Sequence, residues 1–169
     1  MKKNHIIRWA SAVLVILGLA TGAQAASPAT ITLASAANFA VLAGSTVTNT
    51  GPTSLTGDLG LSPGSAVTGF PPGTLTGTQH VADTTAANAK IDLTTAYNEA
   101  AGRSTAPISV SGNIGGRTLV PGLYKSTSTL AISSGDVTLD GGGDANAVFI
   151  FQIASTLTTT SGRKVLLSG

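Results

Sequence analysis

The chain has 169 residues with few charged side chains (9%), few aromatic side chains (4%) and no cysteine. The lack of cysteine excludes disulfide frameworks and thiolate metal sites. The formal net charge of +2 depends on the first eight residues, which hold three of the nine basic side chains; beyond them six basic and seven acidic side chains remain, so no basic surface is left for nucleic acid.

The N-terminal segment has the pattern of a secretory signal peptide. Basic residues precede an apolar run over residues 10–20, and Ala23-Gln24-Ala25 follows as a cleavage site. The run is shorter than the ~20 residues that cross a bilayer. We expect residues 1–25 to be a signal peptide and residues 26–33 a leader; a retained N-terminal anchor is the alternative. The mature protein would be secreted to the extracellular space, or held in the periplasm or at the cell surface, without membrane association.

Residues 31–77 contain short runs of alternating apolar and polar residues, separated by Gly and Pro. Phe39-Ala40-Val41-Leu42-Ala43 and Thr46-Val47-Thr48 show the period of two that is typical of strands, and Pro63-Gly64 is typical of a turn. The pattern predicts short strands that turn corners.

The next segment, from about residue 79 to residue 101, has no Gly or Pro. Ala86, Ala89, Leu93 and Ala96 recur at three- and four-residue steps, which places them on one face of a helix. The pattern predicts one helix over about 79–101, lying close against a flat sheet because its face is mainly alanine. His80 would be a solvated side chain at its start.

After Pro107 the strand pattern resumes, and residues 129–141 and 156–169 resemble offset copies. Ser134-Gly135 precedes Ser161-Gly162 by 27 residues, a spacing typical of stacked solenoid coils. The apolar run over residues 147–153 predicts a strand covered on both sides, beneath the helix. Because the chain ends within this pattern without a polar cap, we expect the domain to be incomplete at its C-terminus.

Few residues in the chain could perform chemistry. His80 is the only histidine beyond the expected signal peptide, which removes most metal sites and catalytic triads. Asp136, Asp140 and Asp144 stand near glycines, where aspartate typically supports turns. A calcium cluster is the alternative for these three, but they match no loop of defined ligand spacing. We therefore expect no catalytic residue, no cofactor and no metal.

Threonine recurs at alternate positions in several predicted strands. The rows are Thr46, Thr48 and Thr50; Thr74, Thr76 and Thr78; and Thr156, Thr158 and Thr160. In a strand such side chains point to one face, about 6.5–7 Å apart along the strand and about 4.8 Å apart between strands. Methyl groups order water and hydroxyls hydrogen-bond it, so a stiff, uncharged grid can match an ice lattice. Threonine also favours strands in general, which leaves an ordinary exposed sheet open.

The residues that open the predicted strands resemble a known family. Phe39-Ala40-Val41-Leu42-Ala43-Gly44-Ser45-Thr46-Val47-Thr48-Asn49-Thr50-Gly51 is similar to the opening of the microbial ice-binding (antifreeze) protein family, and Leu55-Thr56-Gly57-Asp58-Leu59-Gly60-Leu61 to its second signature. Residues 96–103, 121–124 and 147–153 resemble further blocks in the same order, so the resemblance covers about residues 34–169.

The resemblance implies a mainly β fold, a right-handed β-helix (β-solenoid) of triangular cross-section with one α-helix packed along its axis. It implies that the coils stack out of sequence order, with the N-terminal coil beside the C-terminal one, and that several coils of the family's domain are missing from this chain. The implied activity is adsorption to ice through a flat face rich in Thr, Ser and Ala, giving thermal hysteresis and inhibition of ice recrystallisation.

We expect the ice-binding surface to include Thr46, Thr48 and Thr50, with Ser133, Thr158 and Thr160 on strands of the same face. The partner would be the ice crystal surface, and the protein would be a monomer.

Two other functions stay open at this stage. An extracellular adhesion or matrix module would need aromatic platforms, whereas Tyr97, Tyr124 and Phe149 fall in apolar patterns. A β-helix polysaccharide lyase or hydrolase would need acids beside Arg or Lys on one face, and the threonine-bearing strands are almost free of charge. We therefore expect that the protein is not an enzyme.

Overall fold

The structure is a computed structural model that describes residues 27–169; the expected signal peptide lies outside the described residues. Every strand pairing in it is parallel, and each strand pairs with the strand three places along the chain, as β1 does with β4 and β2 with β5. Each coil therefore contributes one strand to each of three sides. This arrangement, with a single α-helix, confirms the predicted β-solenoid.

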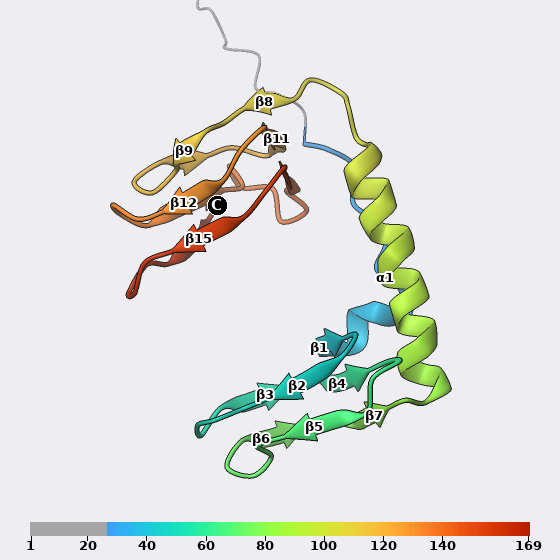
Figure 1. Cartoon of the computed structure of the whole chain (residues 1–169). Helices are drawn as coiled ribbons and strands as arrows, with labels where there is room; N and C mark the ends of the chain where they lie inside the picture. The colour runs from blue at the N-terminus through green and yellow to red at the C-terminus, as the bar shows by residue number, and fades with distance from the viewer. Residues whose placement is uncertain (1–26) are drawn as a thin grey trace, which may run out of the picture.

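The coils form two stacks, which Figure 1 shows one above the other beside helix α1. The N-terminal stack follows a 3-10 helix, η1 (Ala34–Asn38). Its first side, next to the helix, contains β1 (Phe39–Ala43), β4 (Asp58–Leu61) and β7 (Gln79–Val81). Its second side contains β2 (Thr46–Thr48) and β5 (Ala66–Thr68), and its third side β3 (Ser54–Thr56) and β6 (Thr74–Thr76).

The C-terminal stack repeats this order with three strands on every side. The first side contains β8 (Ile108–Ser109), β11 (Gly122–Ser126) and β14 (Phe149–Ile153). The second contains β9 (Gly112–Asn113), β12 (Leu130–Ile132) and β15 (Leu157–Thr159), and the third β10 (Thr118–Leu119), β13 (Val137–Asp140) and β16 (Val165–Ser168). Leu130 lies beside Leu157, so the predicted repeat of 27 residues is the offset between neighbouring coils.

Inward-pointing apolar side chains fill each stack. Leu59 and Leu61 are fully buried in the first stack, and Leu130 in the second. Tyr124 stacks on Phe151 with ring centroids 5.0 Å apart and donates its hydroxyl hydrogen bond to the Val120 carbonyl. Burial raises the pKa of Tyr124 above its ordinary value. Because the buried residues alternate with exposed ones along each strand, the outward residues of every side are fixed by the same packing.

Helix α1 spans Thr84–Gly102, so it begins later than the predicted residue 79. Residues 79–81 instead form β7, which pairs with β4. Asp83 caps the helix by accepting a 2.8 Å hydrogen bond from the Ala86 N–H. This hydrogen bond, followed by one with His80, lowers the pKa of Asp83.

The prediction of a solvated His80 at the helix start was wrong. The side chain belongs to β7 and is half-buried. Its Nδ1 lies 2.8 Å from Asp83 Oδ2, and its ring meets the edge of the Phe39 ring, with centroids 5.7 Å apart. The strand holds this side chain under the helix N-terminus because β7 ends only one residue before the cap.

The helix connects the two stacks through its alanine face. Ala86, Ala89 and Ala96 are buried. At its C-terminal end Gln152 Nε2, on β14, donates hydrogen bonds to the carbonyls of Ala100, Ala101 and Arg103 at 2.8–3.1 Å. The run at residues 147–153 thus lies against the helix end as expected, but β14 pairs only with β11 and is an edge strand in the described chain.

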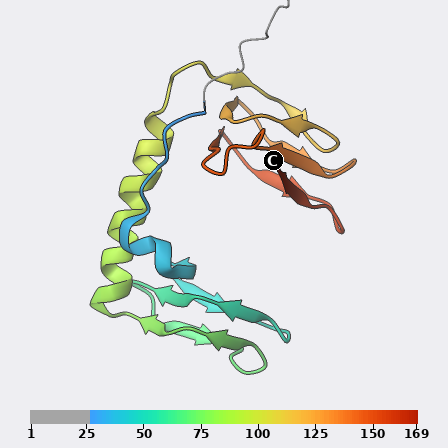
Figure 2. The same ribbon diagram turned by 180° about the vertical axis from the view of Figure 1, so that it is seen from behind.

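The leader also connects the stacks. Ser27 Oγ accepts a hydrogen bond from the Val148 N–H, at the upper stack, and the chain then runs along α1 to η1, as Figure 2 shows. There the Ser35 hydroxyl and N–H both donate to Asp92 on the helix. These two hydrogen bonds, the hydroxyl first, lower the pKa of Asp92.

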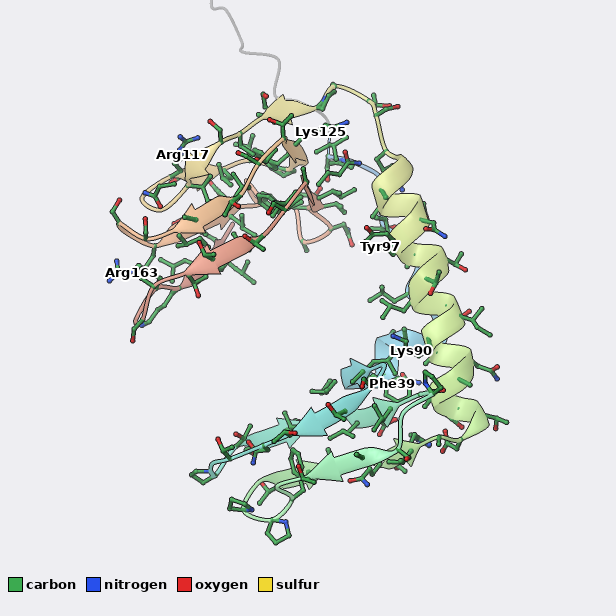
Figure 3. All side chains as sticks on the ribbon, in the orientation of Figure 1. Phe39, Lys90, Tyr97, Arg117, Lys125 and Arg163 are labelled. Atoms are coloured by element: carbon green, nitrogen blue, oxygen red, sulfur yellow. The ribbon has the colours of Figure 1, made fainter. Side chains whose placement is uncertain are left out.

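The stacks are separated along the helix. Lys90 lies near Gly44 of the first stack, and Ala100 contacts β14 of the second. Ten helical residues correspond to roughly 15 Å. Tyr97, expected to be packed, is 69% exposed because it points into this region, where no described residue covers it (Figure 3).

Candidate functional site

The second side of the C-terminal stack presents a grid of small polar and methyl-bearing side chains. Ala131 lies beside Thr158, and Ser133 and Thr160 follow them on the same two coils. Their neighbours in the strands, Leu130 and Ile132, are buried. The alternation therefore directs every second residue outward. One row further on, the hydroxyls of Thr129 and Thr156 lie 3.2 Å apart.

Hydrogen bonds to the neighbouring coil orient several of these hydroxyls. Thr160 Oγ1 donates to the Ser133 carbonyl at 3.2 Å, and Thr158 Oγ1 makes a longer bond of 3.4 Å to the Leu130 carbonyl. Each side chain is then biased to one rotamer, with its methyl group on the outer surface (a threonine has only three staggered choices). A surface of this kind loses little side-chain entropy on contact with a solid.

Asn113, on β9, fixes the end of this grid. Its Oδ1 accepts hydrogen bonds from the Ser133 N–H at 2.9 Å, the Ser133 hydroxyl at 3.1 Å and the Gly115 N–H at 3.1 Å. Its Nδ2 donates to Ser134 Oγ at 2.7 Å. One amide thereby joins two successive coils at the corner between the second and third sides.

The second side of the N-terminal stack has the same character. Thr46 lies beside Ala66 and Thr48 beside Thr68, and all four side chains are exposed. The residues between them, Val47 and Val67, point inward and are half-buried.

An asparagine also builds the corner of this stack. Asn49 Nδ2 donates to the carbonyls of Gly51 at 2.6 Å and Gly69 at 2.9 Å, and its Oδ1 accepts from the Thr53 hydroxyl at 2.7 Å. A Cβ at Gly69 would lie 1.8 Å from the Asn49 carbonyl oxygen, so the coils approach too closely here for any side chain. Thr50 is exposed within this corner and lies beyond the end of β2.

The structure thus brings most of the predicted residues onto corresponding sides of the two stacks. Both stacks progress toward the helix N-terminus, since β7 precedes α1 directly and β14 lies nearer to it than β8. Thr46, Thr48 and Thr158 lie in second strands, and Ser133 and Thr160 immediately follow second strands. Sequence reasoning missed Ala66, Thr68, Ala131 and Asn113, whose places depend on register between coils.

Charged residues are absent from the second-side strands of the described chain. In the C-terminal stack Arg117 and Arg163 lie instead at the end remote from α1 (Figure 3). Asp136 Oδ1 lies 3.6 Å from Arg163 Nη1 and accepts a hydrogen bond from the Lys164 N–H. This acid is therefore occupied in holding two coils together.

The other predicted turn residues have the same kind of role. Asp140 Oδ1 accepts from the Gly142 N–H at 3.0 Å, and Asp144 Oδ1 from the Asn146 N–H at 2.8 Å. These bonds confirm that both carboxylates support turns. Each carboxylate thus completes its own local loop.

A cleft of about 360 Å³ lies between the end of α1 and the first side of the C-terminal stack. Tyr97, Lys125 and Phe151 are among its lining residues, and Gln152 there is already bonded to helix carbonyls. Among residues 27–169, no helix is long and apolar enough to cross a membrane.

Fold and surface together define a class: a three-sided parallel β-solenoid with a lateral helix and an uncharged, threonine-bearing side. Within that class the chain belongs to the ice-binding-like family, whose model matches residues 41–169.

Named relatives and solved structures agree with this membership. An "Ice-binding protein" of Nostoc sp. (strain HG1) is 46% identical over 92% of this chain, and "Ice-binding protein K3-B1" of Typhula ishikariensis is 35% identical over 95%. The crystal structure of an ice-binding protein from an Antarctic biological consortium is 65% identical, with a TM-score of 0.83 over 86% of this chain. That of the Antarctic ascomycete Antarctomyces psychrotrophicus is 38% identical, with a TM-score of 0.75 over 82%.

The chain is shorter than these proteins. The match spans 56% of the Nostoc protein and 74% of the Typhula protein, and 66% and 68% of the two crystallised chains.

Proposed function

We propose that this protein adsorbs to ice through the second sides of its two stacks, and that adsorption causes thermal hysteresis and inhibits ice recrystallisation. The surface consists of the predicted residues Thr46, Thr48, Ser133, Thr158 and Thr160, together with Ala66, Thr68 and Ala131, with Thr50 at its corner. The observation that carries the proposal is the uncharged grid of outward hydroxyl and methyl groups, in register between coils.

The physical basis is the ordering of water before contact with ice. Strands in a sheet lie about 4.8 Å apart, and alternate residues about 6.6–7 Å apart, so the grid has the regular spacing that a crystal can share. Methyl groups favour ordered water around them, and fixed hydroxyls anchor that water by hydrogen bonds. Mobile charged side chains would disturb the layer, and the second-side strands have none among the described residues.

The proposal includes a non-enzymatic, secreted protein acting as a monomer. Adsorption needs no chemical step, and the described aspartates already have structural hydrogen bonds. Thermal hysteresis acts on extracellular ice, which agrees with the signal-like pattern at the N-terminus. The adhesion-module alternative gains little support, since Tyr97 is the one large aromatic side chain strongly exposed in the described chain.

The test is to roughen the surface at one position in each stack. Thr48→Tyr and Thr158→Tyr place a ring on the flat sides, so we expect thermal hysteresis to fall by more than half in each variant. Thr118→Tyr is the matched control, because Thr118 is an exposed strand residue on the third side of the C-terminal stack. If both second-side variants retained full activity, or lost no more than the control, the second side would not be the ice-binding surface.

A further inference from the structure

The threonine row that begins at Thr74 does not lie on the second side. Thr74 and Thr76 belong to β6 on the third side of the N-terminal stack, beside Ser54 and Thr56 of β3. All four side chains are exposed, while Leu55 between them points inward and is half-buried. None of the four hydroxyls has a hydrogen-bond partner among the described residues, so all are available to water.

This grid repeats the geometry of the second side. Ser54 lies beside Thr74 and Thr56 beside Thr76, in parallel register. The spacings are therefore again about 4.8 Å between strands and about 6.6–7 Å along them. Strand β3 is a sheet edge in the described chain, yet neither β3 nor β6 has the lysine that commonly protects an exposed edge.

The third side of the C-terminal stack differs. Its outward row passes from Thr118 through Thr138 to the exposed Leu166, and Asp140 ends the middle strand. Strand preference alone would place threonines on both third sides. The hydroxyl grid is instead confined to the stack in which the third side is uncharged.

The third-side grid is continuous with the second side of the same stack. The corner between them is the Asn49 cluster, in which Asn49 bonds two successive coils and Thr53. Thr50 and Thr53 are exposed in this corner, so hydroxyl groups extend from one side to the next. Because the amide bonds fix the corner, the two grids are held at one angle and each stays flat.

We infer that Ser54, Thr56, Thr74 and Thr76 form a second ice-contacting surface, so that the chain adsorbs to ice in two orientations. The inference rests on the proposed function and extends it. An uncharged hydroxyl grid complements ice as its only extended, uncharged partner with a regular array of donors and acceptors. Two adsorbing surfaces at a fixed angle would let one molecule bind crystal faces of different inclination.

The experiment measures the fraction of full-length protein taken into a slowly growing ice crystal. The second-side double variant, Thr48→Tyr with Thr158→Tyr, is expected to be incorporated less than wild type but clearly more than a protein that does not bind ice. Adding Thr56→Tyr to that background should reduce incorporation to the non-binding level, whereas adding Thr118→Tyr should leave it unchanged. Circular dichroism confirms folding, and Thr76→Lys replaces Thr56→Tyr if that variant does not fold.

The outcomes separate the two proposals. A wild-type protein excluded from ice would overturn the proposed function and the inference with it. A double variant already at the non-binding level would leave the proposed function standing and overturn the second surface. Unchanged incorporation after adding Thr56→Tyr and, in a separate variant, Thr76→Lys would do the same.

Discussion

The corner amide of Asn113 allows a quantitative prediction, because the structure shows each bond that its removal breaks. In Asn113→Ala the N–H groups of Ser133 and Gly115 lose their acceptor, and two side-chain hydroxyl contacts are lost. At about 1 kcal/mol for each backbone donor and about 0.5 kcal/mol for each hydroxyl contact, the free energy of unfolding should fall by about 3 kcal/mol. For a domain of this size, that corresponds to a decrease of roughly 10 °C in Tm.

Thermal unfolding followed by circular dichroism measures this effect, with two comparison variants. Asn113→Asp keeps the accepting oxygen and loses only the bond to Ser134, so its Tm should fall by about a third as much. Asn146→Ala removes an exposed amide whose backbone N–H alone is bonded, and should change the free energy of unfolding by less than ~0.5 kcal/mol. If Asn113→Ala and Asn146→Ala melted at the same temperature, the corner amide would have no structural role, and the rigidity argued for the second side would lose its basis.

Two further predictions concern packing and pH. Leu130 and Leu157 are paired across neighbouring coils, but Leu130 is fully buried and Leu157 is 51% exposed, so Leu130→Ala should lower the free energy of unfolding by about 3–4 kcal/mol and Leu157→Ala by much less; equal losses in denaturant unfolding would contradict the assigned core. The lowered pKa of Asp92 means that its contribution to stability is present above the ordinary carboxyl pKa and is lost as the pH falls through the lowered value, so Tm should decrease less in Asp92→Asn than in wild type between about pH 5 and about pH 2. A pair of parallel Tm curves would show that the Ser35 contact is absent in solution.

The sequence predicted the parts of the fold that local patterns determine. Alternation around Thr46-Val47-Thr48 and the offset of 27 residues are properties of single strands and coils, and both are present in the structure. The helix was predicted too long because Gln79-His80-Val81 fits either a helix or a strand by itself. Pairing with β4 decides for the strand, and Asp83 then provides the cap.

The remainder depends on contacts between residues distant in the sequence. Asn113 bonds Ser133, 20 residues away, and Asn49 bonds Gly69 across the same separation, so neither amide has a local signal. Tyr97 follows the helical period of its buried neighbours, yet it lies opposite the region between the stacks, a position that periodicity alone does not reveal. Thr50 continues an alternating row in the sequence, but the corner at Asn49 removes it from the strand.

The most direct test is nanolitre osmometry on the purified, folded chain, beside a buffer control and the same protein after heat unfolding. We expect a seed crystal to stop growing over an interval below its melting point, with faceted surfaces, and the interval to disappear in the unfolded sample. Growth as free as in buffer, from protein whose circular dichroism shows intact β structure, would contradict adsorption through the ordered grid of hydroxyl and methyl groups.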